Sequence, residues 1–395
     1  MAERDGPSAL SKDVTPAPAA PQASAPIAPD KPGEPQAMPA EERVTYSMSP
    51  GLSGFLGAQR IALAISSYQS GKFYLLGQNV EGGLMVHERF FRKAMGICVP
   101  DKDTILLATL FQILRFKNVL NAGEHINDTF DACYVPREIS VTGELDAHDL
   151  GLLKDGRIVF VNTSYNCLAT PSDRHSFTPL WKPPFISKIV REDRCHLNGL
   201  AMADGVPRYV TAVSRSDTID GWRDRRFDGG IVLDVQSGEI VAGGLSMPHS
   251  PRLHDGRLWL LNSGTGELGW IEPGAGEGAA KFHVLAFCPG FVRGLAFHGR
   301  HAFVGLSKPR YQRFEGLALD QKLAAADSEP WCGVQVIDLN SGVCVHWFRL
   351  DGAVAEFYDL AVVPGVTRPM ALGFTNNEIL GLITHDPLVD GALEI

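Results

Sequence analysis

The chain has 395 residues, of which 45% are hydrophobic and 21% charged, and its formal net charge is −9. This composition is typical of a globular protein with a sizeable core. The acidic balance argues against a nucleic-acid or anionic-membrane surface, because either partner requires a basic face. We therefore expect neither nucleic acid nor membrane as a partner.

The cysteines point to a reducing compartment. The seven cysteines are odd in number, widely scattered and form no C-x-x-C pair, which predicts reduced, mostly buried thiols. The N-terminus is not followed by an apolar signal-peptide region, and no apolar run approaches membrane-spanning length. The expected localisation is the cytoplasm.

The chain begins with a predicted disordered tail over residues 1–45, because residues 14–42 are dominated by Pro and Ala and contain no aromatic residue. From Tyr46 the composition changes to short β-rich runs separated by Gly, Asp and Asn, which predicts a single all-β domain over 46–395. One helix is predicted, over 317–326. The predicted strands are Ile61–Ile65, Lys72–Leu76, Leu84–Phe90, Thr104–Thr109, Arg157–Asn162, Arg208–Val213, Gly230–Val235, Arg257–Asn262, His301–Leu306 and Val334–Leu339.

A hairpin recurs along this domain. In one copy, His148-Asp149-Leu150-Gly151 leads through Asp155-Gly156 into the strand that ends at Asn162. Six copies, aligned on Gly96, Gly151, Gly199, Arg252, Gly294 and Asp359, start between 42 and 65 residues apart. Four-stranded propeller blades repeat every 40–50 residues or so. The sequence therefore predicts a six-bladed β-propeller, with seven blades as the alternative and the strands between Arg60 and Phe90 closing the ring.

The first strand of each blade lines the axis of a propeller, so equivalent positions should converge. Three residues before each alignment point stand Lys93, His148, His196, His249, Phe291 and Glu356. Three imidazoles and a carboxylate are typical ligands of a divalent transition metal. We predict a metal site of His148, His196, His249 and Glu356, with Fe(II) favoured and Zn, Mn or Cu as alternatives. Asp359 is an alternative carboxylate, and a metal-free polar channel is the competing interpretation.

Polar side chains also precede several alignment points by one residue. Asn198, Arg293 and Tyr358 are predicted to position a small polar substrate. A rim of aromatic and cationic residues is a second expectation, with packing between blades as its alternative; the residues are Trp181, Trp222, Arg223, Lys308 and Arg310.

Several motifs resemble an uncharacterised bacterial family with a β-propeller-like domain, some members of which are joined to tetratricopeptide repeats. The motifs are His148-Asp149-Leu150-Gly151, Phe185-Ile186-Ser187, the run from Asp193 to Ala201, the run from Leu245 to Arg252 and the run from Val304 to Arg310. The resemblance extends from about Tyr46 to Pro387 and implies no activity. The architecture is more distantly similar to gluconolactonase-type and carotenoid-oxygenase propellers, which carry a metal on their axis.

Three functions follow as hypotheses. The first is a metal-dependent oxidoreductase of the non-haem iron type, which acts on a small polar substrate. The second is a metal-dependent hydrolase of lactonase type that uses the same ring. The third is a non-catalytic propeller that binds a peptide or a glycan.

Overall fold

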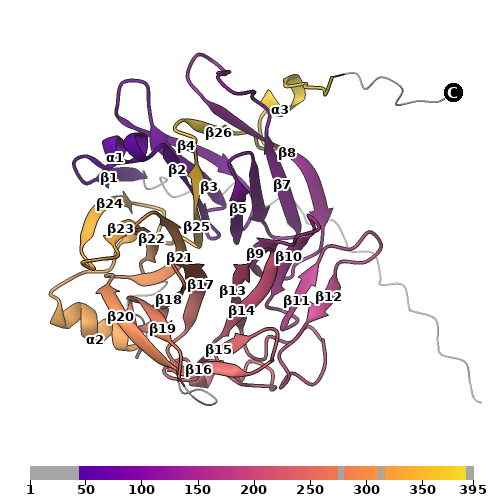
Figure 1. The fold of residues 1–395 in the computed structure, drawn as a ribbon, viewed down its shortest axis with the longest axis vertical. Coiled ribbons are helices and arrows are strands. Elements are labelled where there is room, and N and C mark those ends of the chain that lie inside the picture. Colours follow the sequence, from indigo (N-terminus) through magenta and orange to yellow (C-terminus); the bar gives the residue numbers. More distant parts are fainter. Residues whose placement is uncertain (1–43, 275–279, 310–313, 315, 388–395) are drawn as a thin grey trace, which may run out of the picture. The chain divides into compact units, whose positions relative to one another are not determined.

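The computed structural model describes residues 44–274, 280–309, 314 and 316–387. Within these residues the strands form six sheets, and the inner strand of each sheet contacts the inner strands of the two neighbouring sheets (Figure 1). The contacts between inner strands close a ring, so the fold is the six-bladed β-propeller predicted from the repeats. We number the blades 1 to 6 by their inner strands β5, β9, β13, β17, β21 and β25. The predicted tail lies almost wholly outside the described residues.

The strands of the six blades, from the axis outward, are as follows. Blade 1 contains β5 (Ile97–Asp101), β6 (Thr104–Ala108), β7 (Gln112–Asn118), β8 (Ala132–Val141) and β26 (Pro369–Ala371). Blade 2 contains β9 (Ala147–Leu152), β10 (Ile158–Asn162), β11 (Cys167–Thr170) and β12 (Thr178–Trp181), and blade 3 contains β13 (Leu197–Ala203), β14 (Val206–Ala212), β15 (Gly230–Asp234) and β16 (Ile240–Leu245). Blade 4 contains β17 (Pro248–His254), β18 (Arg257–Asn262), β19 (Glu267–Glu272) and β20 (Lys281–Phe287). Blade 5 contains β21 (Phe291–His298), β22 (His301–Ser307), β23 (Cys332–Asp338), β24 (Cys344–Asp351) and β1 (Thr45–Met48), and blade 6 contains β25 (Asp359–Pro364), β2 (Ile61–Ser67), β3 (Lys72–Gln78) and β4 (Leu84–Phe90).

The two ends of the described chain close the ring. In blade 6 the inner strand β25 pairs antiparallel with β2, so that Leu360 faces Ile65. The strands predicted between Arg60 and Phe90 therefore complete a blade that the C-terminal part of the chain begins. The N-terminal strand β1 adds to the outer edge of blade 5 by pairing with β24. This covers strand edges that would otherwise pair with other chains.

The core consists of layers between neighbouring blades. Successive side chains of a strand point to opposite faces of its sheet. In β2, Ile61, Leu63 and Ile65 pack toward blade 5, while Ala62 and Ala64 pack toward blade 1. Each of the six pairs of neighbouring blades is joined by one such buried cluster. Because both faces of a blade are buried, its middle strands are continuous apolar runs rather than alternating ones.

Helices are few. The helix predicted over 317–326 is confirmed as α2 (Ala318–Ala325), and a short α3 (Glu378–Gly381) follows the last strand. The helix α1 (Leu52–Gln59) was not predicted. Its two glycines, missing side-chain cap and single pair of buried leucines give almost no helical pattern, so its docking on the propeller determines its conformation. No helix among the described residues has the length and apolar character needed to cross a membrane.

Candidate functional site

Two rings of side chains surround the axis, one above the other. Hydroxyl groups at the ends of the second strands fix the register, because Thr163, Ser263 and Ser307 each donate to a carbonyl of the next inner strand, at Leu197, Val292 and Phe357. The residues that follow these carbonyls, Asn198, Arg293 and Tyr358, therefore occupy equivalent positions in blades 3, 5 and 6. The strand pairings of β9 and β17 place His148 and His249 at the same position in blades 2 and 4. We call the residues at this position the inner ring, which consists of Met95, His148, Asn198, His249, Arg293 and Tyr358. The residues two positions earlier in each blade form the rim ring, which consists of Lys93, Asp146, His196, Met247, Phe291 and Glu356.

Backbone geometry supports this register independently. Lys93, Asp146, His196 and Met247 all have left-handed backbone conformations, with φ between 49° and 55°. Such strain in residues other than glycine concentrates at functional sites. The register expected from the sequence, with three histidines in one ring, is therefore wrong: His148 and His249 belong to the inner ring and His196 to the rim ring.

The sequence alignment gave the wrong register because the glycines that it placed at one position occupy two different positions in the blades. Gly199 and Gly294 occupy the position after the inner ring, where the inner strands bulge, and Gly151 does not. At Gly294, φ is +75° and a Cβ would lie 2.6 Å from the Leu360 nitrogen. In blades 2, 4 and 6 the same position carries Asp149, Ser250 and Asp359. An alignment on glycine thus displaces some blades by two residues relative to the others.

His148 and His249 of the inner ring are held in the same way. Nδ1 of His148 lies 2.9 Å from the Asp146 carbonyl and 2.8 Å from Thr163 Oγ1. Nδ1 of His249 lies 2.8 Å from the Met247 carbonyl and 3.0 Å from Ser263 Oγ. Because the carbonyls only accept and both hydroxyls donate elsewhere, each Nδ1 must carry the proton. Each neutral ring therefore keeps Nε2 as an acceptor.

Burial reinforces the neutral state of both rings. Desolvation, followed by the charge of His196, lowers the pKa of His148 well below its usual value. Desolvation, followed by Arg293, lowers the pKa of His249 in the same direction. Both imidazoles are thus uncharged at neutral pH.

Four inner-ring side chains carry buried polar atoms that have no hydrogen-bond partner among the described residues. These atoms are Asn198 Nδ2, His249 Nε2, Arg293 Nε and the Tyr358 hydroxyl, and all four side chains belong to residues at most 9% exposed. The Asn198 amide is oriented by Thr211, whose hydroxyl donates to Asn198 Oδ1 at 2.7 Å. Buried polar atoms without partners are costly and rare in proteins. Their convergence on the axis marks a ligand site.

Arg293 is a buried cation without a carboxylate partner in the described part of the chain. Its guanidinium carbon lies 5.2 Å from the ring centroid of Phe291 and 5.1 Å from that of Tyr358. Aromatic faces stabilise a cation only partly. The surrounding imidazoles are neutral, so the positive charge is available to an anionic ligand.

His196 of the rim ring is paired with a carboxylate. Its Nδ1 donates to Asp193 Oδ2 at 2.6 Å, and its backbone N–H donates to Asp193 Oδ1 at 3.0 Å. The ring stacks on Trp222 at 4.2 Å between centroids and makes an edge contact with His148 at 5.0 Å. The Asp–His pair has the arrangement of a general base and the group that orients it. The spacing Asp193-x-x-His196 could have indicated this pair in the sequence.

The carboxylates of the rim are otherwise engaged. Asp146 accepts from Lys93 at 2.6 Å. Glu356 accepts from the Gln69 N–H at 3.1 Å and, at 3.4 Å, from the Ser67 hydroxyl and the Tyr68 N–H. Glu356 therefore anchors the turn after β2 as well as lining the cavity.

A cavity of about 620 Å³ lies above the inner ring and is lined by all six rim residues. Below it the axis narrows to a space of about 10 Å³ between His148, Asn198, His249, Arg293 and Tyr358, and this space is also lined by Asp149, Ser250 and Asp359. Phe314, Leu317 and the first residues of α2 pack with Trp222 and Met247 over one side of the cavity. An ion pair between Lys322 and Glu267 attaches α2 to blade 4.

A layer of carboxylates and a guanidinium closes the narrow end. Asp149 accepts from its own strand at Leu150 and from the next blade at Leu200, both at 2.9 Å. Asp359 repeats this pattern with Leu360 and Ile97 at 2.8 Å. Burial, followed by the charge of Asp149, raises the pKa of Asp359 to about 7.

The predicted substrate residues Asn198, Arg293 and Tyr358 meet in one ring, and their role in binding stays a prediction. Of the predicted rim, Trp222, Arg223 and Lys308 line the cavity. Trp181 packs in the core between blades 2 and 3 instead, and Arg310 lies outside the described residues. Sequence reasoning missed Asp193 and the hydroxyls of Thr163 and Ser263.

The predicted metal ligands do not assemble into one set. Among the described residues, no three His, Cys, Asp or Glu side chains lie close enough together to hold a metal ion. His196 is one ring above the other two histidines, and Glu356 is held by the turn after β2. The charge of Arg293 acts on both His148 and His249 and would oppose a cation held between them. Metal binding stays a prediction, which elemental analysis of the native protein would test.

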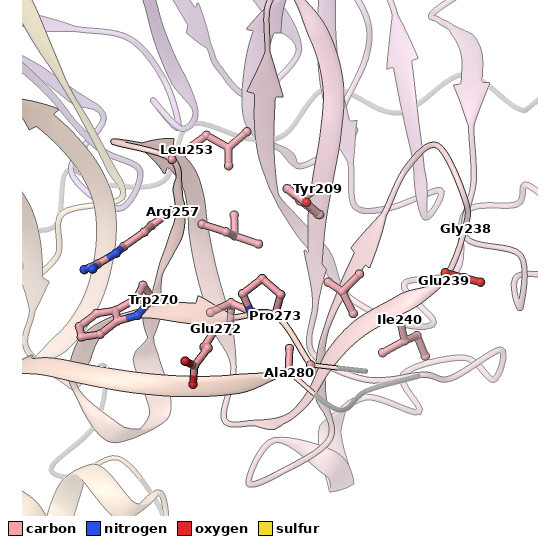
Figure 2. A pocket seen from close by; sticks show the side chains of 15 residues that line it. Tyr209, Gly238, Glu239, Ile240, Leu253, Arg257, Trp270, Glu272, Pro273 and Ala280 are labelled. Atoms are coloured by element: carbon pink, nitrogen blue, oxygen red, sulfur yellow. The ribbon is translucent and has the colours of Figure 1, made fainter. Parts of the chain in front are cut away.

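A second hollow, of about 730 Å³, lies between blades 3 and 4 (Figure 2). Tyr209, Ile240, Leu253, Trp270 and Pro273 line it, and the Arg257 guanidinium lies 4.9 Å from the Trp270 ring. It contains none of the predicted site residues and none of the buried unpartnered atoms. The axial cavity is therefore the candidate site.

Comparisons with known proteins place this geometry in a family. No curated protein matches the chain. Among solved structures, a nidogen/laminin complex matches at 12% identity over 77% of this chain and 99% of that one, with a TM-score of 0.49. Virginiamycin B lyase from Staphylococcus aureus matches at 12% identity over 78% and 99% with a TM-score of 0.37, and a gluconolactonase from Xanthomonas campestris at 12% over 74% and 86% with 0.41.

Similarity this weak transfers no ligand or activity to the chain, so the site has to be interpreted from its own residues. A family model, in contrast, matches residues 50–372, which include both rings and every strand except β1. The chain therefore belongs to the family described as "Domain of unknown function (DUF4915)", in agreement with the resemblance to an uncharacterised propeller family.

Proposed function

We propose that the chain is a hydrolase that acts on a small anionic or strongly polar substrate in the axial cavity. The observation that carries the proposal is the Asp193–His196 pair at the rim, directly above a ring whose buried donors have no partners within the described part of the chain. A base held by a carboxylate and a set of preorganised donors are the two elements that hydrolysis of a carbonyl compound requires.

His196 would act as the general base. Its Nδ1 proton is committed to Asp193, which leaves Nε2 to accept a proton from a water molecule. The stacked Trp222 keeps the imidazole plane fixed. The water adds to the substrate carbonyl, and the proton held on Nε2 is then returned to the leaving alcohol.

The inner ring would stabilise the negative charge that develops on the carbonyl oxygen. Arg293, Asn198 and Tyr358 each present an unpartnered N–H or O–H in a buried space. Such donors strengthen as the oxygen becomes charged, and each contributes about 10²-fold or more to the rate when well placed. Water is the expected nucleophile, since burial raises the pKa of the Cys195 thiol beside His196.

A panel of small polar lactones and carboxylic esters, including hydroxylated ones, tests the proposal in an assay of acid release. The wild-type protein should hydrolyse at least one member, and His196→Ala should reduce kcat/KM by about 10²–10⁴-fold. His283→Ala is the matched control, because His283 lies on the outer strand of blade 4 and pairs with exposed Glu272. Equal turnover by wild-type protein and His196→Ala would overturn the assignment of the base.

The metal-dependent oxidoreductase expected from the sequence is a second candidate. The observation in its favour is that His148 and His249 donate Nδ1–H to carbonyls, as metal-ligating histidines do. A divalent metal would polarise substrate or water at their Nε2 atoms. Elemental analysis of native protein separates the candidates: near-stoichiometric metal that disappears in His249→Gln supports the second, while turnover unaffected by chelators supports the first.

A further inference from the structure

The hydrogen-bonding atoms of the inner ring specify the chemistry of a ligand. Arg293 Nε, Asn198 Nδ2 and the Tyr358 hydroxyl can donate, and none has a partner among the described residues. His249 Nε2 is the opposite kind of group, because the Nδ1 proton of His249 is already donated to the Met247 carbonyl. The ring thus offers three donors, one of them charged, and at least one acceptor.

We infer that the inner ring binds a hydroxycarboxylate, with the carboxylate on Arg293 and Tyr358 and the adjacent hydroxyl between Asn198, which donates to it, and His249, which accepts from it. This inference rests on the proposed function, since hydrolysis of a 2-hydroxy ester, or of a lactone that carries a hydroxyl beside its carbonyl, releases such a product. A plain carboxylate would leave His249 Nε2 without a donor. A neutral diol would leave the Arg293 charge without a counterion, and both losses are costly in a buried site.

The shape of the cavity agrees with this orientation. The narrow space at the inner ring, about 10 Å³, holds one water-sized group, which would be the hydroxyl of the ligand. The carboxylate and the rest of the molecule would lie in the 620 Å³ cavity, whose lining includes Arg293 and Tyr358 as well as Trp222, Phe291 and Met247. Asp149 and Asp359 also line the narrow space, so a neutral hydroxyl is favoured there over a carboxylate.

Calorimetric titration of the full chain with three matched probes tests the inference: 2-hydroxyhexanoate, hexanoate and 1,2-hexanediol. The hydroxy acid should bind at least about 10-fold more tightly than either probe that lacks one group, which corresponds to one lost buried hydrogen bond or more. Equal affinity for hexanoate and 2-hydroxyhexanoate would refute the role of His249. Tighter binding of the diol would refute the carboxylate subsite, and no binding of any probe would overturn the inference as a whole.

Single-residue variants assign the contacts. Tyr358→Phe should weaken 2-hydroxyhexanoate binding about 10-fold, and Arg293→Met by about 100-fold or more. Tyr74→Phe is the matched control, because the Tyr74 hydroxyl is also buried but lies in the core between blades 5 and 6. His249→Phe should abolish the preference for the hydroxy acid over hexanoate. An unchanged preference in folded His249→Phe would contradict the proposed acceptor.

Binding and turnover separate this inference from the proposed function. Binding of 2-hydroxyhexanoate without hydrolysis of any lactone or ester would reject the hydrolase and keep the ligand class. Hydrolysis of an ester by a protein that binds none of the three probes would reject the ligand class and keep the hydrolase.

Discussion

The Arg252 guanidinium, on the inner strand of blade 4, contacts both carboxylate oxygens of Asp149, on the inner strand of blade 2, at 2.8 and 3.2 Å. Blade 3 lies between them in the ring, so this ion pair reaches past one blade. A second carboxylate, that of Asp359 on blade 6, lies 3.9 Å from the same guanidinium. One cation therefore joins inner strands from three alternate blades below the ligand site.

Removal of this cation should destabilise the propeller. Arg252→Met leaves the carboxylate of Asp149, whose side chain is 4% exposed, without its ionic partner. Loss of one member of a buried pair typically lowers the free energy of unfolding by about 3–5 kcal/mol. Urea denaturation measures the change. Arg157→Met, which breaks the exposed pair with Asp155, is the control and should cost less than about 1 kcal/mol; similar values for both variants would contradict a structural role of the buried pair.

The pH dependence of stability should reveal the protonated state of Asp359. Its pKa is raised from the usual 3.8 to about 7, so the folded chain binds this proton more tightly than the unfolded chain does. The stability that this group contributes is complete below pH 3.8 and is lost as the pH rises through 7. The free energy of unfolding of Asp359→Asn, relative to that of the wild type, should therefore rise by about 2–4 kcal/mol between pH 4 and pH 8.

Denaturation curves at several pH values measure that difference. Asp173→Asn, which changes an exposed carboxylate outside the axial layer, is the control and should run parallel to wild type. An Asp359→Asn profile that is also parallel to wild type would show that Asp359 is ionised in the folded protein.

The tautomers of His148 and His249 can be observed directly. Both should carry their proton on Nδ1 and stay neutral one unit below the ordinary histidine pKa, since burial lowers the pKa of each. Long-range nitrogen–proton NMR spectra distinguish the two ring nitrogens. His249→Gln assigns one signal, and a protonated Nε2 in either ring would contradict the hydrogen-bond pattern on which the ligand inference depends.

Gly294 should be intolerant of any side chain. An alanine there would adopt φ of +75° and place its Cβ 2.6 Å from the Leu360 nitrogen. The expected loss of stability is about 2–5 kcal/mol, from backbone strain and overpacking together. Gly299→Ala isolates the strain, because φ is +54° and nothing lies within 4 Å; its loss should be about 1–2 kcal/mol. Thermal unfolding of both variants measures the difference, and equal losses would exclude a packing constraint at the bulge.

Much of the fold follows from the local pattern of the sequence. Short β-rich runs between turn residues mark the strands, as at Leu84–Phe90 and Arg257–Asn262, whose bounds are the predicted ones. The recurrence of the hairpin implies six blades, because each repeat is one unit that can bury its faces only against its neighbours. The pattern also singled out Asn198, Arg293 and Tyr358.

The composition of each ring, in contrast, is decided by tertiary structure. Whether His196 lies beside His148 or above it depends on a bulge in each inner strand, and a bulge shifts the register without leaving a fixed letter in the sequence. Glycine marks the bulge in blades 3 and 5, while Asp149 marks it in blade 2, where its carboxylate binds the next inner strand. The sequence alone therefore determines that polar side chains meet on the axis, and only the packed blades determine which of them share a plane.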